Sequence, residues 1–369
     1  MLKRKIKAII SGGGTGGHIF PAIAIANELK KINNENEILF VGAKGRIEME
    51  KVPAAGYNIV GLNISGIQRR FTVSNFLIPF KVIVSVMKAK KIIIQFKPDV
   101  VVGVGGYVSA PLLYAATQLR IPSLIQEQNS YAGMTNKILA KRVQRICVAY
   151  DGMERYFPKE KIVITGNPVR QDIGQIEGKR MDALRFFGLS SGKKTVLVIG
   201  GSLGARTINE SIVAALPQWV EKNIQVIWQT GKSFFEEARK CTAEMGDNGI
   251  NAVEFIQRMD LAYAAADIVV SRAGAGSISE LALVSKPAIL VPSPNVAEDH
   301  QTKNAQSLIT NNAAILIKDE EAKERLANAV INLMGDESRQ RMLSENISKL
   351  AIKNSAEKIT NEIYDLIDH

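Results

Sequence analysis

Residues 9–30 have the sequence IISGGGTGGHIFPAIAIANELK, in which an apolar run typical of a β-strand enters a glycine-rich turn and then a helical pattern. Residues 198–216, VIGGSLGARTINESIVAAL, repeat this order of strand, glycine turn and helix. The two turns begin at Gly12 and Gly200, so 188 residues, about the length of one domain, separate them. A glycine turn between a strand and a helix is typical of nucleotide-binding α/β domains, and its recurrence predicts two such domains.

Short β-branched runs alternate with longer helical patterns along the chain, as they do in doubly wound parallel sheets. The predicted strands are residues 6–10, 38–41, 100–104, 123–126, 146–149 and 162–165 in the first domain, and 195–199, 225–229, 267–271 and 288–292 in the second. Glycine and proline punctuate residues 165–174, so we place the first domain at 1–167 and the second at 168–344. The helical pattern at about 345–369 is expected to pack back on the first domain. The predicted fold class is α/β, with two Rossmann-like doubly wound domains.

The composition is that of an ordinary globular protein, with 46% hydrophobic and 22% charged residues among 369. No stretch reaches the roughly 18 uninterrupted apolar residues of a spanning helix, so we expect no integral membrane segment. Cys147 and Cys241 lack metal-binding or CxxC spacing and are expected to be packing residues in a reducing compartment. The net charge of +11 predicts an anionic partner, with nucleic acid, a phospholipid surface and a phosphorylated substrate all left open.

The first glycine turn, residues 12–17, satisfies the GxGxxG pattern of dinucleotide sites. Those sites also need an acidic residue at the end of the next strand, where this chain has Lys44, so a nicotinamide or flavin cofactor is disfavoured. Five glycines in six residues give a diphosphate close access to backbone N–H groups at a helix N-terminus. The alternative is a tight turn that binds no ligand.

His18 comes directly after this turn, in the first turn of the predicted helix. The helix dipole there favours the neutral, proton-accepting imidazole. His18 is therefore our candidate general base. The alternative is a structural histidine that caps its own turn.

Two further glycine-rich turns follow strands of the second domain. GGSLGAR (200–206) contains Ser202, whose hydroxyl can donate a hydrogen bond to phosphate, and SRAGAGSISE (271–280) ends in Glu280, whose carboxylate can accept both hydroxyls of a ribose. Each could instead be only a turn or a helix cap. The Walker pattern is absent, because GKS at 231–233 lacks the required earlier glycine at Val226, and this disfavours ATP hydrolysis.

Seven motifs, in order along nearly the whole chain, resemble those of the MurG family of glycosyltransferases. They are GGGTGGHIFPAIAIA (12–26), GVGGYVSAP (103–111), QEQNSYAGMTNK (126–137), TGNPVR (165–170), GGSLGAR (200–206), SRAGAGSISE (271–280) and EDHQTKNA (298–305). The resemblance implies a GT-B fold, with two Rossmann-like domains across a cleft, the acceptor in the N-terminal half and the donor in the C-terminal half. Ala110 and Gly276 depart from the family pattern, which usually has glycine and a bulkier apolar residue at these positions.

The resemblance also implies an inverting transfer of N-acetylglucosamine from UDP-GlcNAc to undecaprenyl-diphosphate-linked muramoyl-pentapeptide, which converts lipid I into lipid II in peptidoglycan synthesis. His18 would be the base, with Glu127 in reserve, and no cofactor or bound metal is implied. The substrate-binding residues would be Thr15, Gly16, Gly17, Asn129, Arg170, Ser202, Ile256, Ala275, Gly276, Ser277, Glu280, His300 and Gln301. Among these, Arg170 and Ser202 would hold the diphosphate, Ile256 the uracil, Glu280 the ribose, and Asn129, His300 and Gln301 the sugar.

Residues 66–98 combine apolar side chains with lysines and arginines and contain no acidic residue. Such a segment suits docking on an anionic membrane surface, although a core helix with solvated lysines would share the pattern. Because the implied acceptor is lipid-borne, the resemblance favours a peripheral protein on the cytoplasmic face of the inner membrane. Contacts with other cell-wall synthesis proteins and a role in cell shape and division would fit that location.

Two other functions are compatible with parts of the sequence. One is another UDP-sugar enzyme of the GT-B fold, such as a non-hydrolysing UDP-GlcNAc 2-epimerase or a glycolipid transferase. The other is a non-catalytic basic module that binds nucleotides or nucleic acid. No aromatic stacking motif or helix-turn-helix pattern supports the second alternative, so we expect no nucleic-acid partner.

Overall fold

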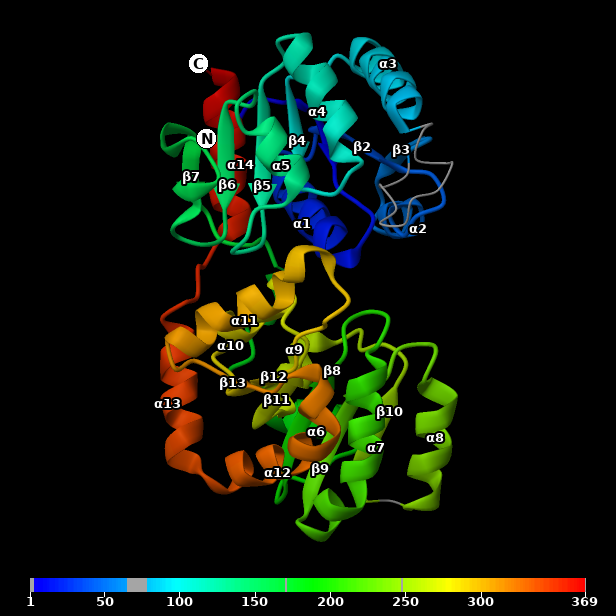
Figure 1. Cartoon of the computed structure of the whole chain (residues 1–369), viewed down its shortest axis with the longest axis vertical. Coiled ribbons are helices and arrows are strands. Elements are labelled where there is room, and N and C mark those ends of the chain that lie inside the picture. Colours follow the sequence, from blue (N-terminus) through cyan, green and yellow to red (C-terminus); the bar gives the residue numbers. More distant parts are fainter. Residues whose placement is uncertain (1–2, 65–77, 170, 247, 369) are drawn as a thin grey trace. The chain divides into compact units, whose positions relative to one another are not determined.

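A computed structural model describes residues 3–64, 78–169, 171–246 and 248–368. The chain forms two compact units, Met1–Val169 with Ile352–His369, and Arg170–Ala351. Each unit is a parallel sheet covered by helices on both faces, which confirms the predicted fold class of two Rossmann-like domains (Figure 1). No helix within the described ranges is both long enough and apolar enough to cross a membrane.

The first unit contains a seven-stranded parallel sheet in the order β3-β2-β1-β4-β5-β6-β7. Its strands are β1 (Lys7–Ser11), β2 (Glu37–Ala43), β3 (Asn58–Leu62), β4 (Val100–Gly103), β5 (Ser123–Glu127), β6 (Arg145–Val148) and β7 (Ile162–Ile164). In the middle of the sheet, Ile9 is paired with Leu39 on one side and with Val101 on the other. Strands buried on both faces are apolar almost throughout, and this is why the sequence shows them as short β-branched runs.

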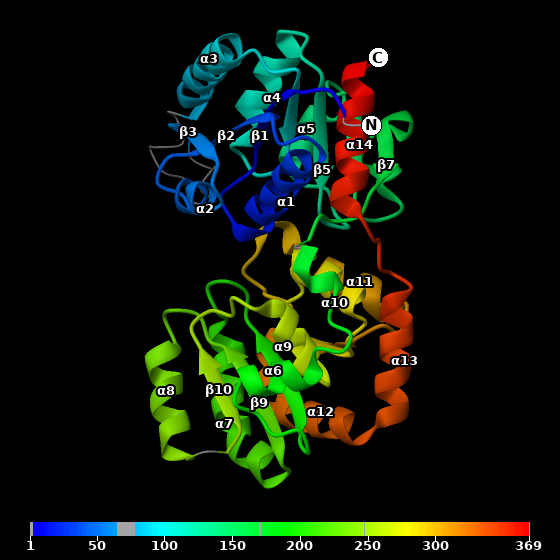
Figure 2. The same cartoon turned by 180° about the vertical axis from the view of Figure 1, so that it is seen from behind.

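Two hydrophobic cores flank this sheet. One lies under α3 (Ile78–Phe96), α4 (Ser109–Gln118) and α5 (Met134–Leu139). The other lies under α1 (Gly16–Ile32) and the C-terminal helix α14 (Ser355–Asp368), while α2 (Glu48–Ala54) follows β2 (Figure 2). The segment that returns to the first unit begins at Ile352. The sequence predicts its start at about residue 345.

The second unit contains a six-stranded parallel sheet in the order β10-β9-β8-β11-β12-β13. Its strands are β8 (Lys194–Ile199), β9 (Ile224–Gln229), β10 (Ile250–Val253), β11 (Ile268–Ser271), β12 (Ala288–Leu290) and β13 (Ile315–Leu316). Its helices are α6 (Arg180–Phe186), α7 (Arg206–Glu221), α8 (Phe235–Glu244), α9 (Met259–Ala265), α10 (Ala275–Val284), α11 (His300–Thr310), α12 (Ala322–Gly335) and α13 (Glu337–Ser348).

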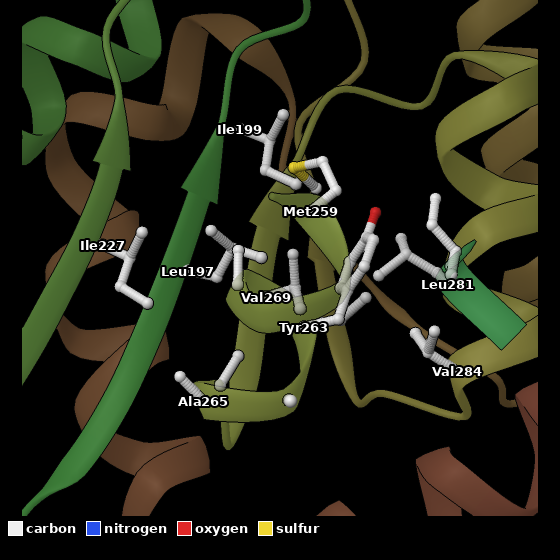
Figure 3. Close-up of a cluster of buried hydrophobic side chains, with 14 of the residues drawn as sticks. Leu197, Ile199, Ile227, Met259, Tyr263, Ala265, Val269, Leu281 and Val284 are labelled. Atoms are coloured by element: carbon white, nitrogen blue, oxygen red, sulfur yellow. The ribbon is translucent and has the colours of Figure 1, made fainter. Parts of the chain in front are cut away.

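The core on one face of the second sheet joins the strands to α9 and α10. Figure 3 shows Leu197 and Val269 of the strands close to Tyr263 of α9, with Leu281 of α10 on the far side of the tyrosine ring. The opposite face is covered by α7 and α12. The predicted boundary between the domains, 167/168, lies two residues before the division between the units.

Candidate active site

The predicted glycine turns lie where the strand order of each sheet reverses. In the first sheet, β1 and β4 are neighbours, and the chain leaves them toward opposite faces through α1 and α4. In the second sheet, β8 and β11 are neighbours and are followed by α7 and α10 on opposite faces. Open α/β sheets bind ligands at such switch points, beyond the carboxyl ends of the strands. The topology therefore gives each unit one candidate site.

In the first unit, the turn from β1 into α1 is built on backbone geometry. Gly14 has a φ of +85°, and Thr15 is extended and precedes Gly16, the first residue of α1. The N–H groups in the first turn of a helix have no partner within the helix. Thr15, Gly16 and Gly17 are therefore placed to meet a ligand, and which ligand they bind stays a prediction.

His18 lies in the first turn of α1, with its imidazole against the turn that follows β4. Its Nδ1 is 3.1 Å from the carbonyl oxygen of Gly13 and 3.3 Å from Oγ1 of Thr15. A Cβ at Gly105 would lie 2.8 Å from Cδ2 of the imidazole, and both Gly105 and Gly106 have positive φ. Only glycine allows this backbone and this close approach, so the GVGGY motif forms the seat of the His18 ring.

Glu48, the first residue of α2, lies beneath the same turn, and the sequence alone predicts no role for it. Its side chain is fully buried and accepts the N–H of Gly14 at 3.0 Å and the N–H of Ala43 at 2.9 Å. A Cβ at Gly13 would lie 2.3 Å from its Oε1, and a Cβ at Gly42 would lie 2.6 Å from its Cγ. These two glycines therefore leave space for the Glu48 carboxylate. No local sequence pattern predicts this arrangement.

Tyr107 lies in the GVGGYVSAP motif, and the sequence alone predicts no role for it. A Cβ at Gly14 would lie 3.5 Å from Cε1 of its ring. Its hydroxyl oxygen is buried and has no hydrogen-bond partner among the described residues. Because buried hydroxyls are nearly always paired, Tyr107 is a further candidate for contact with a substrate.

Glu127, at the end of β5, holds the loop that follows it. Its Oε1 accepts the backbone and side-chain N–H groups of Asn129 at 3.1 and 3.2 Å. Its Oε2 accepts from the backbone of Gly133 and from Nδ2 of Asn136, both at 2.9 Å. A carboxylate with both oxygens engaged in this way is a structural element of the loop, so the geometry favours His18 over Glu127 as the base.

Buried amide side chains connect three of the seven sequence motifs, all in the first unit. Gln126 donates through Nε2 to Oδ1 of Asn167 at 3.0 Å, and Asn167 donates through Nδ2 to the carbonyl of Gln128 at 2.9 Å. Gln128 in turn donates to the carbonyl of Val104 at 2.7 Å. The network fixes the loops after β4, β5 and β7 against one another.

In the second unit, the turn from β8 into α7 passes close to the end of β9. Gly204 has a φ of +78°, and a Cβ there would lie 2.0 Å from the carbonyl oxygen of Thr230. A Cβ at Gly231 would lie 2.2 Å from the carbonyl oxygen of Leu203. The two turns therefore touch through backbone alone, which explains glycine in both GGSLGAR and TGKS.

Gln229, the last residue of β9, connects this turn to the predicted uracil site. Its Nε2 donates to the carbonyl of Gly201, and its Oε1 accepts the N–H of Ile256, each at 2.9 Å. Ile256 is buried in the core. Ser202 is exposed and directly follows Gly201, whose carbonyl accepts the hydrogen bond from Gln229. Gln229 is not among the residues predicted from sequence, although a polar residue at the end of an apolar strand is a usable signal.

The first turn of α10 begins at Ala275, with Gly276 and Ser277 next. Glu280 follows on the same helix, and its Oε2 accepts a hydrogen bond of 3.0 Å from the hydroxyl of Tyr263. The tyrosine ring is fully buried in the core that Figure 3 shows. Glu280, the predicted ribose-binding residue, is thus held by Tyr263 of α9, for which the sequence predicts no role.

The last predicted contacts lie where α11 begins. Gln301 accepts the N–H of Ser293 through Oε1 at 2.9 Å, so it holds the loop after β12. Nε2 of His300 is 3.7 Å from a carboxylate oxygen of Glu298. Arg170, the predicted diphosphate ligand, lies outside the described residues.

Arg272 of the SRAG motif fixes neighbouring loops of the second unit. It is 9% exposed and donates to the carbonyls of Val291 at 2.9 Å and Pro292 at 3.1 Å. It also forms an ion pair with Asp319. The arginine therefore supports the turn before α10 from within.

The described residues include neither a metal-ligand cluster nor an activated cysteine. No group of three His, Cys, Asp or Glu side chains is placed to hold a metal ion in the described part of the chain. Cys147 is buried, and burial raises the pKa of its thiol. Burial also raises the pKa of the Cys241 thiol, so neither cysteine is activated.

Comparisons with known proteins agree with the two-unit architecture. The model of the glycosyltransferase family 28 N-terminal domain matches residues 8–148, and that of the family 28 C-terminal domain matches residues 195–363. A curated relative from Parabacteroides distasonis is 55% identical over 99% of both chains, and one from Flavobacterium psychrophilum is 51% identical over 98% of both. Both bear the name UDP-N-acetylglucosamine–N-acetylmuramyl-(pentapeptide) pyrophosphoryl-undecaprenol N-acetylglucosamine transferase.

Solved structures show the same fold. The crystal structure of MurG from Acinetobacter baumannii has a TM-score of 0.78 at 28% identity and covers 99% of both chains. A UDP-N-acetylglucosamine 2-epimerase has a TM-score of 0.65 at 14% identity, with 98% of this chain and 95% of the epimerase covered. At that identity the likeness concerns the fold alone.

Proposed function

The chain belongs to the MurG family within glycosyltransferase family 28, and from this membership we propose that it transfers N-acetylglucosamine from UDP-GlcNAc to muramoyl-pentapeptide diphospho-undecaprenol. The observation that carries the proposal is the 55% identity, over 99% of both chains, to a relative whose name states this reaction. A fold alone would not suffice, because related folds host many chemistries. The residues at the two switch points supply the parts that the reaction needs.

The second unit binds the donor in this proposal. Ser202 and the N–H groups that begin α7 and α10 attract the diphosphate, because a helix N-terminus carries partial positive charge. Glu280, held by Tyr263, accepts the ribose hydroxyls, and Ile256 borders the uracil. Arg170, Ala275, Gly276, Ser277, His300 and Gln301 complete the donor site.

The first unit supplies the base. Nε2 of His18 takes the proton from the acceptor hydroxyl, while the oxygen of that hydroxyl bonds to the anomeric carbon of the donor. The bond between that carbon and the diphosphate oxygen breaks, and UDP leaves with the electron pair. Attack on the face opposite the leaving group turns the α-linked donor into a β-linked product. The N–H donors around the diphosphate stabilise the charge that develops on it.

The direct test is transfer of labelled N-acetylglucosamine from UDP-GlcNAc to a lipid-linked muramoyl-pentapeptide, with the linkage of the product determined by NMR. A β-linked disaccharide that appears only with the acceptor is expected. Conversion of UDP-GlcNAc to an epimer without acceptor would identify the enzyme as an epimerase instead. A folded protein that binds UDP-GlcNAc but transfers to no muramoyl acceptor would point to another glycolipid acceptor.

We also propose that α3 docks the first unit on an anionic membrane. Ile83, Met87 and Ile94 are 58%, 65% and 61% exposed and lie on one stripe of this helix, with Lys90 in the same stripe. Exposed apolar side chains with flanking lysines suit the interface of an anionic bilayer. Of the predicted segment 66–98, residues 66–77 lie outside the described residues.

Vesicle flotation tests this docking. The double substitution Ile83→Ser with Met87→Ser should lower binding to vesicles that contain phosphatidylglycerol, because it removes apolar surface from the stripe. Met342→Ser is the matched control, since Met342 is an exposed methionine of α13 in the second unit. Activity on a water-soluble acceptor should not change. Equal flotation of the double variant and the control would exclude α3 as the docking surface.

A further inference from the structure

The peptide group that joins Gly13 to Gly14 makes a hydrogen bond on each side. Its carbonyl oxygen, on Gly13, lies 3.1 Å from Nδ1 of His18. Its N–H, on Gly14, donates to Oε2 of Glu48 at 3.0 Å. In a trans peptide the C=O and the N–H point in opposite directions, so one peptide plane connects the buried carboxylate to the imidazole.

The surrounding residues leave this carboxylate little freedom. Glu48 is fully buried, and its other oxygen accepts the N–H of Ala43 at 2.9 Å. Gly13 and Gly42 lack the Cβ atoms that would collide with the Glu48 side chain. The glutamate therefore fixes the orientation of the Gly13–Gly14 peptide, and with it the direction in which the Gly13 carbonyl faces.

This orientation decides which nitrogen of His18 carries the proton. A carbonyl oxygen can only accept, so Nδ1 must be the donor, and in the neutral ring Nε2 then carries the acceptor lone pair. A carboxylate on the N–H side polarises the peptide and makes its carbonyl a stronger acceptor. A carboxylate orients the catalytic histidine directly in a Ser-His-Asp triad. Here Glu48 orients His18 in the same way, through one peptide group between the two side chains.

We propose that Glu48 is a positioning residue for the transfer reaction, which sets the tautomer of His18 and stabilises its protonated form through the Gly13–Gly14 peptide. This inference rests on the proposed function, in which His18 is the base. Among the described residues, the charged or titratable groups that contact the turn are Glu48 from α2 and Tyr107 from the turn after β4. The ring also lies against Oγ1 of Thr15 and against Gly105 and Gly106.

The test is Glu48→Gln, with Glu50→Gln as the matched control, because Glu50 is an exposed glutamate of the same helix. Glutamine has one oxygen and one NH₂ group, so either the N–H of Gly14 or that of Ala43 loses its acceptor. Turnover should fall roughly 10- to 100-fold, the range found when a residue that orients a metal-bound histidine is removed. The KM for UDP-GlcNAc should stay nearly constant.

Two readouts separate positioning from a merely structural effect. The acid limb of the pH–rate profile should move to lower pH, because the protonated imidazole loses the carboxylate that stabilises it. The imidazole nitrogen NMR spectrum, assigned by comparison with His18→Gln, should lose its bias toward the Nδ1–H tautomer. A slower enzyme with an unmoved acid limb and an unchanged tautomer would overturn the inference.

The NMR readout also separates failure of this inference from failure of the proposed function. If wild type transfers no sugar but shows a Glu48-dependent tautomer, the function is wrong and the contact stands. If Glu48→Gln does not fold, the wild-type spectrum still decides, because a dominant Nε2–H tautomer contradicts the Gly13 contact. The chain has only three histidines, which makes the assignment practicable.

Discussion

The turns after β1 and β8 share one sequence pattern but are supported differently. A buried carboxylate, Glu48, lies beneath the first turn and accepts the N–H of Gly14. A neutral amide, Gln229, supports the second turn and donates to the carbonyl of Gly201. In the first unit the negative charge of Glu48 faces the turn from the interior of the protein. In the second unit Gln229 occupies the carbonyl of Gly201 as an acceptor and adds no charge.

This difference assigns different tasks to two similar motifs. A carboxylate next to a loop disfavours a second anion there but suits a histidine that must become positive during the reaction. A turn supported by an amide keeps the full attraction of a helix N-terminus for a diphosphate. We therefore expect substitutions around the first turn to change turnover, and substitutions around the second turn to change donor affinity.

The largest effect is expected for His18→Ala. Removal of a general base typically lowers turnover about 10²- to 10⁴-fold, whereas UDP binding, assigned to the second unit, should be retained. Single-turnover transfer and calorimetric titration with UDP measure the two quantities. Full activity in this variant would remove His18 as the base, and a parallel loss of UDP affinity would break the division of tasks.

Gly204→Ala should destabilise the second unit by about 2–5 kcal/mol, from the collision with the Thr230 carbonyl and the cost of positive φ. Gly201→Ala is the matched control, because it also has positive φ but meets nothing within 4 Å, and should cost only about 1–2 kcal/mol. Both tryptophans, Trp219 and Trp228, lie in the second unit, so their fluorescence in a denaturant series reports its unfolding. Equal destabilisation would mean that the close approach of the turns is unimportant.

The strands divide into those that the sequence predicts and those that it does not. Central strands such as β1 and β8 are within one residue of the predicted ranges, because burial on both faces makes them continuously apolar. The three missed strands, β3, β10 and β13, all lie at sheet edges. β10 and β13 are only partly buried throughout, and β3 is buried only at its last two residues. β13 has two residues, and β10 contains an asparagine, so neither carries a readable hydrophobic pattern.

The candidate sites divide in a similar way. His18 and Glu280 could be proposed from sequence because they stand within or next to glycine turns that are local patterns. The contacts that hold these turns and side chains could not be predicted, because the two partners of each contact are distant along the chain. Glu48 is 34 residues from Gly14, Gln229 is 28 from Gly201, and Tyr263 is 17 from Glu280. Such contacts exist only after the sheet has assembled.

A charge exchange at Gln229 sharpens the comparison of the two turns. Gln229→Glu cannot donate to the Gly201 carbonyl and places a negative charge beneath the second turn, as Glu48 does beneath the first. We expect the Kd for UDP to rise roughly 10-fold, which corresponds to about 1.4 kcal/mol. Gln218→Glu, an exposed position on α7, controls for the change in net charge. An unchanged Kd would show that the support of the turn does not set its affinity for anions.

The smallest effect is expected for Tyr263→Phe, which removes one hydrogen bond to Glu280 and keeps the packing of the ring. A hydrogen bond to a charged group contributes about 1.5–3 kcal/mol. Because the Glu280 carboxylate keeps its proposed contact with the ribose in this variant, we expect only a several-fold rise in the KM for UDP-GlcNAc. Tyr57→Phe, which removes a tyrosine hydrogen bond to Asn27 in the first unit, is the matched control.

Discrimination between UDP and its 2′-deoxy analogue decides what this small effect means. If Tyr263 orients Glu280 toward the ribose hydroxyls, Tyr263→Phe should weaken UDP more than the deoxy analogue and leave turnover nearly constant. If both nucleotides weaken equally, Tyr263 only stabilises the core between α9 and α10. If turnover falls instead of affinity, the second unit takes part in the chemical step, and the separation of tasks drawn from the two turns is wrong.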